Sequence, residues 1–197
     1  IKSNTILLQK FIDKKNELCL DGFSVNKGKD VFISIAASYN YIVPGQYSCD
    51  MTLSNFHDSK LFSKIKAMIA EIGYEGIFCI EFLIEKNGNL SFLEVNFRNS
   101  GWSYASTSVG MNLPVLWAQG MLEHKVPEGS YKPIPKGYRA IAEFPDFKIR
   151  VLGHRIRMLK WIKDIKKCNC FFIINKKDMK PFWTTVESKI KTKLFRL

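Results

Sequence analysis

The chain of 197 residues is 46% hydrophobic and 13% aromatic, enough apolar material for one compact domain or one and a half. It has no apolar run near the roughly 20 residues that a bilayer crossing needs, and its first residues lack a signal-peptide pattern. The net charge of +12 fits a basic face in a protein with anionic substrates, which we favour, or a nucleic-acid-binding domain, for which no known motif is present.

Three strands are predicted near the start of the chain. Residues 5–11 and 17–25 are rich in apolar and β-branched residues, with a turn predicted at 13–16, and a third strand, 31–37, follows a second turn. Together they predict a meander, the start of an antiparallel sheet. Residues 39–56 have no clear period and predict a loop whose tyrosines could line a pocket.

A helix is predicted after this loop. Asp58 or Ser54 can cap its N-terminus, and Gly73 can end it. Between them the apolar residues follow helical spacing: Leu61, Phe62, Ile65, Met68, Ile69 and Ile72. We expect this helix to pack on the sheet.

The most specific pattern is a hairpin of residues 77–85 and 90–98. The pair Asn87-Gly88 between two alternating apolar runs is typical of a two-residue turn. In the register that this turn sets, Lys86 faces Asn89, Leu83 faces Phe92, Glu81 faces Glu94 and Cys79 faces Asn96. Alternation then gives one buried apolar face, made of Phe78, Ile80, Phe82, Ile84, Leu93, Val95 and Phe97. The opposite face carries Glu81, Phe92, Glu94, Asn96 and Arg98.

The polar face of the hairpin contains a candidate metal site. In this register Glu81 faces Glu94 with Cβ atoms about 5 Å apart, so the two charges repel unless a cation lies between them. With the amide oxygen of Asn96 they suit Mg²⁺ or Mn²⁺ completed by water and phosphate oxygens. Arg98 supplies a fork for phosphate or carboxylate. The same pattern also fits the solvated face of an ordinary half-buried hairpin.

A loop and a second helix follow the hairpin. Residues 99–104 are rich in small side chains, so their backbone N–H groups can approach an anion. Asn112 is a good N-cap and Pro114 fits a first turn, which predicts a helix within residues 110–122.

The remainder of the chain is basic and less regular. Residues 125–137 predict a connector, 138–144 and 171–174 predict strands, 150–167 fit either strand or helix, and 184–195 predict a final helix. The last fifty residues contain fifteen Lys or Arg and three Asp or Glu, so most of the excess positive charge lies there.

The cysteines and histidines indicate neither a disulfide framework nor a zinc site. The five cysteines are odd in number and spread along the chain, which favours reduced thiols in or near the core of a cytoplasmic protein. The three histidines have no ligand spacing.

Three segments, Glu81-Phe82, residues 92–101 and residues 110–114, resemble the metal-binding end of the ATP-grasp superfamily, nearest its carbamoyl-phosphate-synthase-like and carboxylate-amine ligase members. Residues 8–12 resemble its hinge more weakly, and residues 9–17 also fit an ordinary hairpin with a polar turn. The resemblance implies an α+β fold: an antiparallel β-sheet flanked by helices, with a small C-terminal α/β extension.

The resemblance also implies roles for single residues. The metal ligands would be Glu81, Glu94 and Asn96, and Arg98 would contact phosphate or an acyl-phosphate intermediate as the catalytic residue. The nucleotide would be bound by the hinge residues Gln9, Lys10, Phe11 and Ile12, by Glu17 at the ribose and by Phe92 under the adenine, and the substrate by Ser100 and Gly101.

The implied activity is an ATP-dependent ligase with ATP and Mg²⁺ or Mn²⁺ as cofactors. ATP would phosphorylate a carboxylate, and an amine or thiol would displace phosphate from the acyl phosphate. The family's upstream lobe, with its lysine and mobile loop, cannot be placed in residues 1–8. We therefore expect residues 1–122 to be the downstream lobe, 123–197 to be a basic extension, and this piece of a longer cytoplasmic ligase to be inactive alone.

Two other functions remain open from the sequence. One is a basic module that binds anions or nucleic acid, and the other is a non-catalytic remnant of the ligase fold. An upstream lobe would be the partner in the same polypeptide, and an oligomer is compatible with the sequence.

Overall fold

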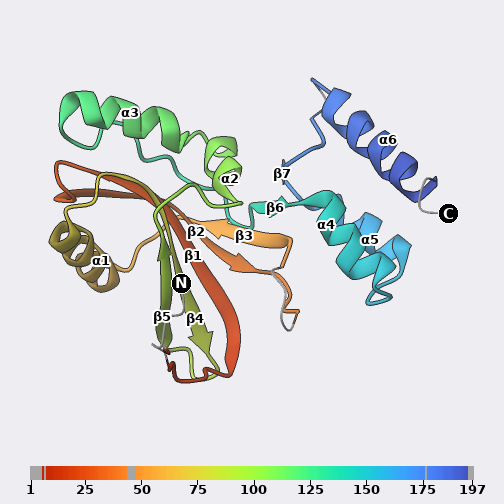
Figure 1. Cartoon of the computed structure of the whole chain (residues 1–197), viewed down its shortest axis with the longest axis horizontal. Helices are drawn as coiled ribbons and strands as arrows, with labels where there is room; N and C mark the ends of the chain where they lie inside the picture. Colours follow the sequence, from red (N-terminus) through yellow and green to blue (C-terminus); the bar gives the residue numbers. More distant parts are fainter. Residues whose placement is uncertain (1–5, 7, 44–47, 176, 195–197) are drawn as a thin grey trace.

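The computed structural model describes residues 6, 8–43, 48–175 and 177–194, with side chains as far as residue 188. Within this part, seven strands form one sheet in the order β5-β4-β1-β2-β3-β6-β7 (Figure 1). Neighbouring strands are antiparallel except β6 and β7, which are parallel. The predicted α+β class, a largely antiparallel sheet flanked by helices, is confirmed.

The strands are β1 (Lys14–Val25), β2 (Asp30–Tyr39), β3 (Asp50–Ser54), β4 (Gly76–Glu85), β5 (Leu90–Asn96), β6 (Arg139–Ile141) and β7 (Cys170–Phe171). The helices are α1 (Ser59–Ile72), α2 (Ser103–Ser108), α3 (Leu113–Glu123), α4 (Glu143–Phe147), α5 (Met158–Ile165) and α6 (Lys180–Leu194). A π-helical turn, Lys148–Leu152, continues α4. No helix of the described residues combines the length and apolarity that a bilayer crossing requires.

Helices cover both faces of the sheet, as Figure 1 shows for α1 on one side and α2 and α3 on the other. Ile65 and Ile69 of α1 belong to a core with Leu20, whereas Leu113 of α3 belongs to a second core with Phe23. Strand β1 is therefore buried on both faces, and its successive side chains enter different cores.

Helices α1 and α3 begin at the caps that the sequence indicates. Asp58 caps α1 by accepting a hydrogen bond from the backbone N–H of Leu61 (2.9 Å), and Gly73 ends it with φ 63°. Asn112 caps α3 in the same way through Val115 N–H (3.3 Å). Both predicted helices are confirmed.

The β4–β5 hairpin is confirmed, but its turn is one residue longer than predicted. Glu85 N–H donates to Asn89 O (2.9 Å), which leaves three residues in the turn. Gly88 lies in the left-handed region (φ 89°), the usual arrangement of three-residue turns. The prediction that Lys86 faces Asn89 is therefore wrong.

A bulge at Leu93 restores the predicted register further along. Beyond it Glu81 faces Glu94 and Cys79 faces Asn96, as predicted, but before it Phe92 faces Phe82 rather than Leu83. An extra residue in one strand reverses the faces of the side chains on either side of it.

The predicted face of Phe92 is wrong as a result of this bulge. Its ring meets that of Phe82 edge to face with centroids 5.9 Å apart, and Phe82 belongs to the core beneath α1. Phe92 therefore lies on the opposite face of the sheet from Glu81, where it cannot support a nucleotide bound beside the two glutamates.

The predicted strand at residues 5–11 is not observed in its described part, because residues 8–11 have no strand partner there. Leu8 and Phe11 are exposed, and an unpaired strand gains neither ladder hydrogen bonds nor packing. Residues 5 and 7 lie outside the described residues. The turn predicted at 13–16 is also wrong, since β1 begins at Lys14 and pairs there with Glu85.

Other differences concern short elements. The predicted loop at 39–56 contains β3, and the predicted loop at 99–104 leads directly into α2. The strand predicted at 138–144 shortens to β6, and the strand predicted at 171–174 overlaps β7 only at Phe171. The final helix starts earlier, at Lys180, and its predicted end at residue 195 lies outside the described residues. All five cysteines are buried thiols, as predicted.

Candidate functional site

A cavity of about 320 Å³ opens on the α2 side of the sheet. Its floor comes from β1, β4 and β5, and its walls come from the segment before α2 and from residues near β3, β6 and β7. The lining residues are Cys19, Tyr39, Ser48, Cys49, Cys79, Glu81, Glu94, Arg98, Ser100, Gly101, Trp102, Ala142 and Phe172. Five residues predicted to bind metal, phosphate or substrate thus line one cavity.

Asn96 links the two glutamates and the arginine of this cavity. Its Nδ2 donates hydrogen bonds to Glu81 Oε1 (3.2 Å) and Glu94 Oε1 (2.8 Å). Its Oδ1 accepts a hydrogen bond from Arg98 Nη2 (3.2 Å). The positive end of the amide therefore lies between the two carboxylates, where their repulsion calls for positive charge.

The electrostatics of the site favour a bound cation. Burial raises the pKa of Glu81, and the negative charges of Glu94 and Glu17 raise it further, while Arg98 only partly offsets them. A raised carboxyl pKa means that the ionised form is destabilised where it stands. A cation bound beside Glu81 would relieve this destabilisation.

The donor set fits a hard divalent ion whose shell is completed from outside the protein. The described residues contain no group of three or more His, Cys, Asp or Glu placed to hold a metal ion. Glu81 and Glu94 offer two carboxylates, which suits Mg²⁺ with water and phosphate ligands rather than a closed protein cage. Asn96 presents its NH₂ group to them, so the amide must turn before its oxygen can bind a metal.

The residues predicted for the adenine and the hinge do not line the cavity. Residues 9–12 lie in a segment without helix or strand, with Gln9, Lys10 and Phe11 exposed. Glu17 is different: it is buried in β1, forms an ion pair with Lys14, and its charge acts on Glu81. The structure thus brings together the phosphate end of the predicted site but not its adenine end.

Asp21 is a residue of this site that the sequence analysis missed. It is 2% exposed and accepts a hydrogen bond from Ser100 Oγ (2.7 Å), and the same oxygen of Ser100 accepts one from Trp102 N–H (3.0 Å). Asp21 therefore anchors the loop that forms one wall of the cavity. The available signal was the alternation of Glu17, Cys19 and Asp21, which places all three on one face of β1.

We predict that Asp21→Asn flattens the pH dependence of stability. Burial raises the pKa of Asp21 to about 6, although the hydrogen bond from Ser100 counteracts part of this rise. The unfolded chain has a value near 3.9, so stability falls as the pH rises from about 4 to about 6 and levels off above, by roughly 3 kcal/mol at most. Urea unfolding at a series of pH values measures this slope.

The control for Asp21→Asn is Asp58→Asn, because asparagine caps a helix as well as aspartate does. Asp58→Asn should keep the slope between pH 4 and pH 6. An Asp21→Asn variant with the wild-type slope would show that another group causes the pH dependence.

Solved structures share this fold. An L-amino acid ligase from Bacillus licheniformis superimposes with a TM-score of 0.50 at 19% identity, over 63% of this chain and 34% of that chain. N5-carboxyaminoimidazole synthetase from Staphylococcus aureus gives 0.54 at 17% identity, over 72% and 38% of the two chains. Its complex with ADP gives 0.54 at 16% identity, over 75% and 40%. The chain spans less than half the length of these enzymes.

A family model assigns the sequence. The chain belongs to the ATP-grasp family described as "ATP-grasp in the biosynthetic pathway with Ter operon", whose model matches residues 7–142. A comparison with curated protein sequences finds no match. The match covers β1 to β6 and therefore includes both glutamates, Asn96 and Arg98.

Proposed function

We propose that this chain provides the metal- and phosphate-binding lobe of an ATP-dependent ligase that activates a carboxylate as an acyl phosphate. One observation carries the proposal: Glu81, Glu94 and Arg98 line the same cavity in a member of the ATP-grasp family. In the reaction, a carboxylate oxygen of the substrate attacks the γ-phosphorus of ATP and ADP leaves. An amine or thiol then attacks the carbonyl carbon, and phosphate leaves.

The residues of this cavity act in that chemistry through charge and position. Phosphoryl transfer depends mainly on positioning and charge neutralisation. Glu81 and Glu94 would hold Mg²⁺ or Mn²⁺, which supplies positive charge to the phosphates when bound. Arg98 places a guanidinium at the rim, and Ser100 and Gly101 supply the wall that anchors to Asp21. The buried floor of Cys19 and Cys79 limits the access of water.

The nucleotide would extend beyond this cavity. We propose that Glu17 contacts the ribose and that Gln9, Lys10, Phe11 and Ile12 contact the adenine edge, in an arrangement completed by an upstream lobe. The upstream lobe is supported by the share of the solved enzymes that this chain covers, which is 34% to 40%. The division into a lobe at 1–122 and an extension at 123–197 remains a prediction, since β6 and β7 continue the sheet.

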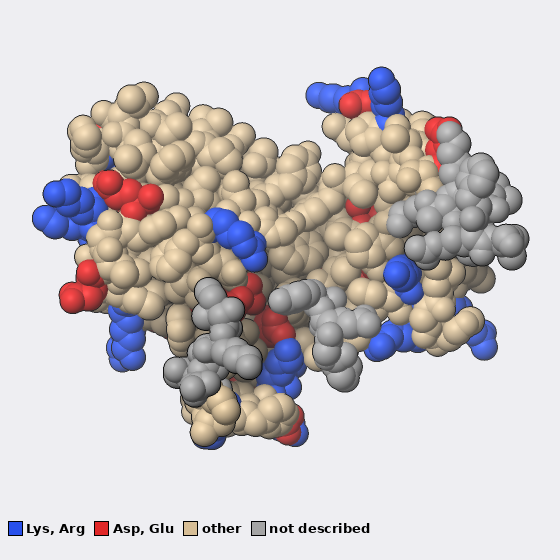
Figure 2. Space-filling view, viewed as in Figure 1, with Lys and Arg blue, Asp and Glu red and all other residues tan. Residues whose placement is uncertain are grey.

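The surface gives less support to the nucleic-acid alternative. On the face in Figure 2, Lys and Arg side chains lie in separate groups instead of one continuous strip. Nucleic-acid binding domains usually present clustered basic residues along the path of the phosphates.

The proposed function predicts that ATP binds to residues 1–197 only weakly without Mg²⁺ and more tightly with it. We expect Glu81→Gln to weaken the binding of Mn²⁺ by about tenfold or more, because one of two charged ligands is lost. Calorimetry with Mn²⁺ alone, ATP alone and Mg-ATP measures these affinities. Little ATP hydrolysis is expected from this chain, because half a cleft leaves the triphosphate in water, where ion pairs are weaker.

Glu123→Gln is the matched control, since Glu123 is exposed at the end of α3, away from the cavity. It should bind Mn²⁺ like the wild type. Equal Mn²⁺ affinity in Glu81→Gln and wild type would refute the metal site, and tight binding of duplex DNA without Mg-ATP binding would favour the basic module.

A further inference from the structure

A second and larger cavity, of about 580 Å³, lies on the other face of the sheet. Asp50 and Arg139 line it from β3 and β6. Their strand neighbours Met51 and Ala140 belong to the core beneath α2 and α3, so alternation directs Asp50 and Arg139 to the opposite face. The lining residues are Asn40, Tyr41, Ile42, Val43, Asp50, Arg139, Arg150, Arg155, Ile156, Lys160 and Asp164.

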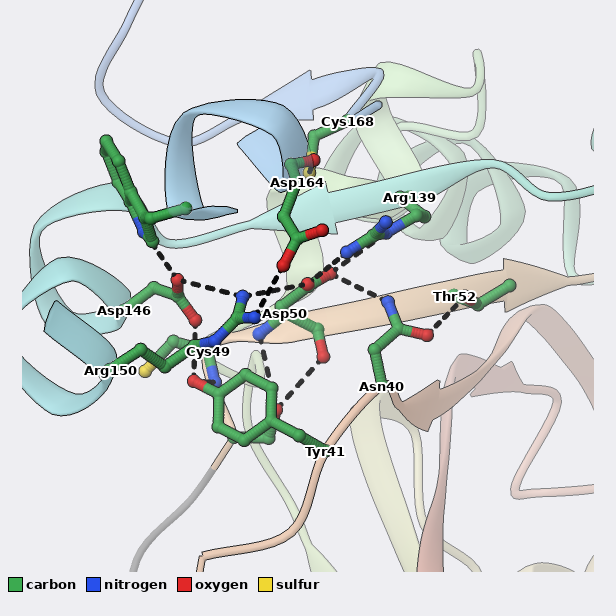
Figure 3. A network of polar contacts seen from close by, with 12 residues as sticks. Asn40, Tyr41, Cys49, Asp50, Thr52, Arg139, Asp146, Arg150, Asp164 and Cys168 are labelled. Atoms are coloured by element: carbon green, nitrogen blue, oxygen red, sulfur yellow. Dashed lines mark hydrogen bonds and ion pairs between the residues drawn. The ribbon is translucent and has the colours of Figure 1, made fainter. Parts of the chain in front are cut away.

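The inner wall of this cavity is a fixed polar network, which Figure 3 shows. Asp50 is 1% exposed and accepts hydrogen bonds from Asn40 Nδ2 (2.7 Å) and Arg139 Nε (3.2 Å). A second bond from Arg139 Nη2 makes the guanidinium contact bidentate. These hydrogen bonds hold the side chains in place, and Arg139 neutralises the negative charge of Asp50.

Arg150 lies at the centre of the network and is itself 8% exposed. Its Nη2 donates to Asp164 Oδ2 (2.6 Å), while Nη1 is 3.6 Å from Asp146 Oδ2 and 3.8 Å from Asp50 Oδ2. The ring of Tyr41 lies 4.9 Å from its guanidinium carbon. Within the described part of the chain, Nη1 has no hydrogen-bond partner.

The outer wall carries cations that the network does not neutralise. Arg155 and Lys160 line the cavity, and neither forms an ion pair with any residue that the structure describes. Four cations and two carboxylates therefore line the cavity, an excess of two positive charges. Asp146, which pairs with Arg150 from outside the lining, reduces this excess to one. Ile42, Val43 and Ile156 add an apolar wall.

We propose that this cavity is a second ligand site, for a small molecule that carries a phosphate or carboxylate on an apolar body. The oxyanion contacts Arg155 and Lys160, which have no counterion among the described residues, and the body lies against Ile42, Val43 and Ile156. The buried network keeps the inner wall rigid, so the ligand meets a preformed surface. Because the site is on the opposite face from Glu81 and Glu94, its ligand binds independently of metal.

Calorimetry on residues 1–197 with phenyl phosphate, benzoate and inorganic phosphate tests the proposal, in about 0.15 M salt to screen distant charges. Phenyl phosphate and benzoate share a ring and differ in the oxyanion, so the order of their affinities shows whether the site prefers a phosphate or a carboxylate. The double variant Arg155→Ala/Lys160→Ala removes the proposed contacts. Lys163→Ala/Lys166→Ala removes the same charge from exposed positions on and just after α5 that do not line the cavity.

We expect phenyl phosphate or benzoate to bind the wild type, and the first double variant to weaken that binding about tenfold or more, the size of a lost charge-assisted contact. The control double variant should change it less than about twofold. Glu94→Gln should leave it unchanged. Equal loss in both double variants, or no binding of either aromatic anion at about 10 mM, would overturn the proposal.

Discussion

Asp50→Ala is expected to lower the free energy of unfolding by about 3–5 kcal/mol, a large part of the 5–15 kcal/mol typical of a domain. Asp50 is buried, with a side chain 1% exposed, and it balances Arg139 and the nearby Arg150, whose side chains alone are 19% and 10% exposed. Removing it leaves two largely buried guanidinium groups short of a counter-charge. Urea unfolding followed by circular dichroism measures the change.

The control for Asp50→Ala is Glu128→Ala. Glu128 pairs with Lys125 at 3.5 Å, but its side chain is 94% exposed, and exposed pairs contribute at most about 1 kcal/mol. If Asp50→Ala costs no more than Glu128→Ala, the network around Arg150 does not stabilise the fold, and the rigid inner wall that we assign to the second cavity is wrong.

Glu94→Gln is expected to reduce ATP turnover by more than about 100-fold in the ligase that we propose to contain this lobe. Mutating a group that hydrogen-bonds to a metal ligand typically lowers metal affinity or activity about 10–100-fold, so losing the ligand itself should lower activity more. The fold should survive, because Glu94 is exposed and lies on the polar face of the hairpin. ATP consumption and thermal unfolding are measured on the same preparation.

The same variant has a consequence that does not depend on activity. Burial is the main cause of the raised pKa of Glu81, and the negative charge of Glu94 is the next largest cause. Without it the pKa of Glu81 should fall, so less stability is lost as the pH rises through the range where carboxylates ionise. Glu94→Gln should therefore be more stable relative to wild type at pH 7 than at pH 4. Glu71→Gln, exposed on α1, should show no such difference, and turnover near wild type in Glu94→Gln would refute the metal role.

Local patterns predicted the elements whose signals are local. Helix α1 begins at Asp58 and ends at Gly73 because a side-chain cap and a left-handed glycine act within a single turn. The hairpin follows from Asn87 and Gly88 between two alternating runs. Glu81 and Glu94 could be paired from sequence because both lie within this one hairpin.

Features that depend on distant pairing were not predictable in this way. The bulge at Leu93 has no local signature, and it moved Phe92 to the other face. Strand β3 is only five residues long, and its place in the sheet comes from pairing with β2 and β6. Asp21 joins the site only because β1 pairs with β4, and the loop at Ser100 returns over both.

Phe172 forms a wall of the site cavity that is synthesised later than the two glutamates. Its ring meets that of Trp102 with centroids 5.1 Å apart, and the carboxylate of Glu143 accepts hydrogen bonds from the backbone N–H groups of residues 172–174. Glu81 and Glu94 leave the ribosome about eighty residues before Phe172. At a synthesis rate of about 5–20 residues per second, this delay is about four to sixteen seconds. We therefore expect the nascent chain to carry an open groove until then, and the site to become a cavity only when β7 and Phe172 are in place.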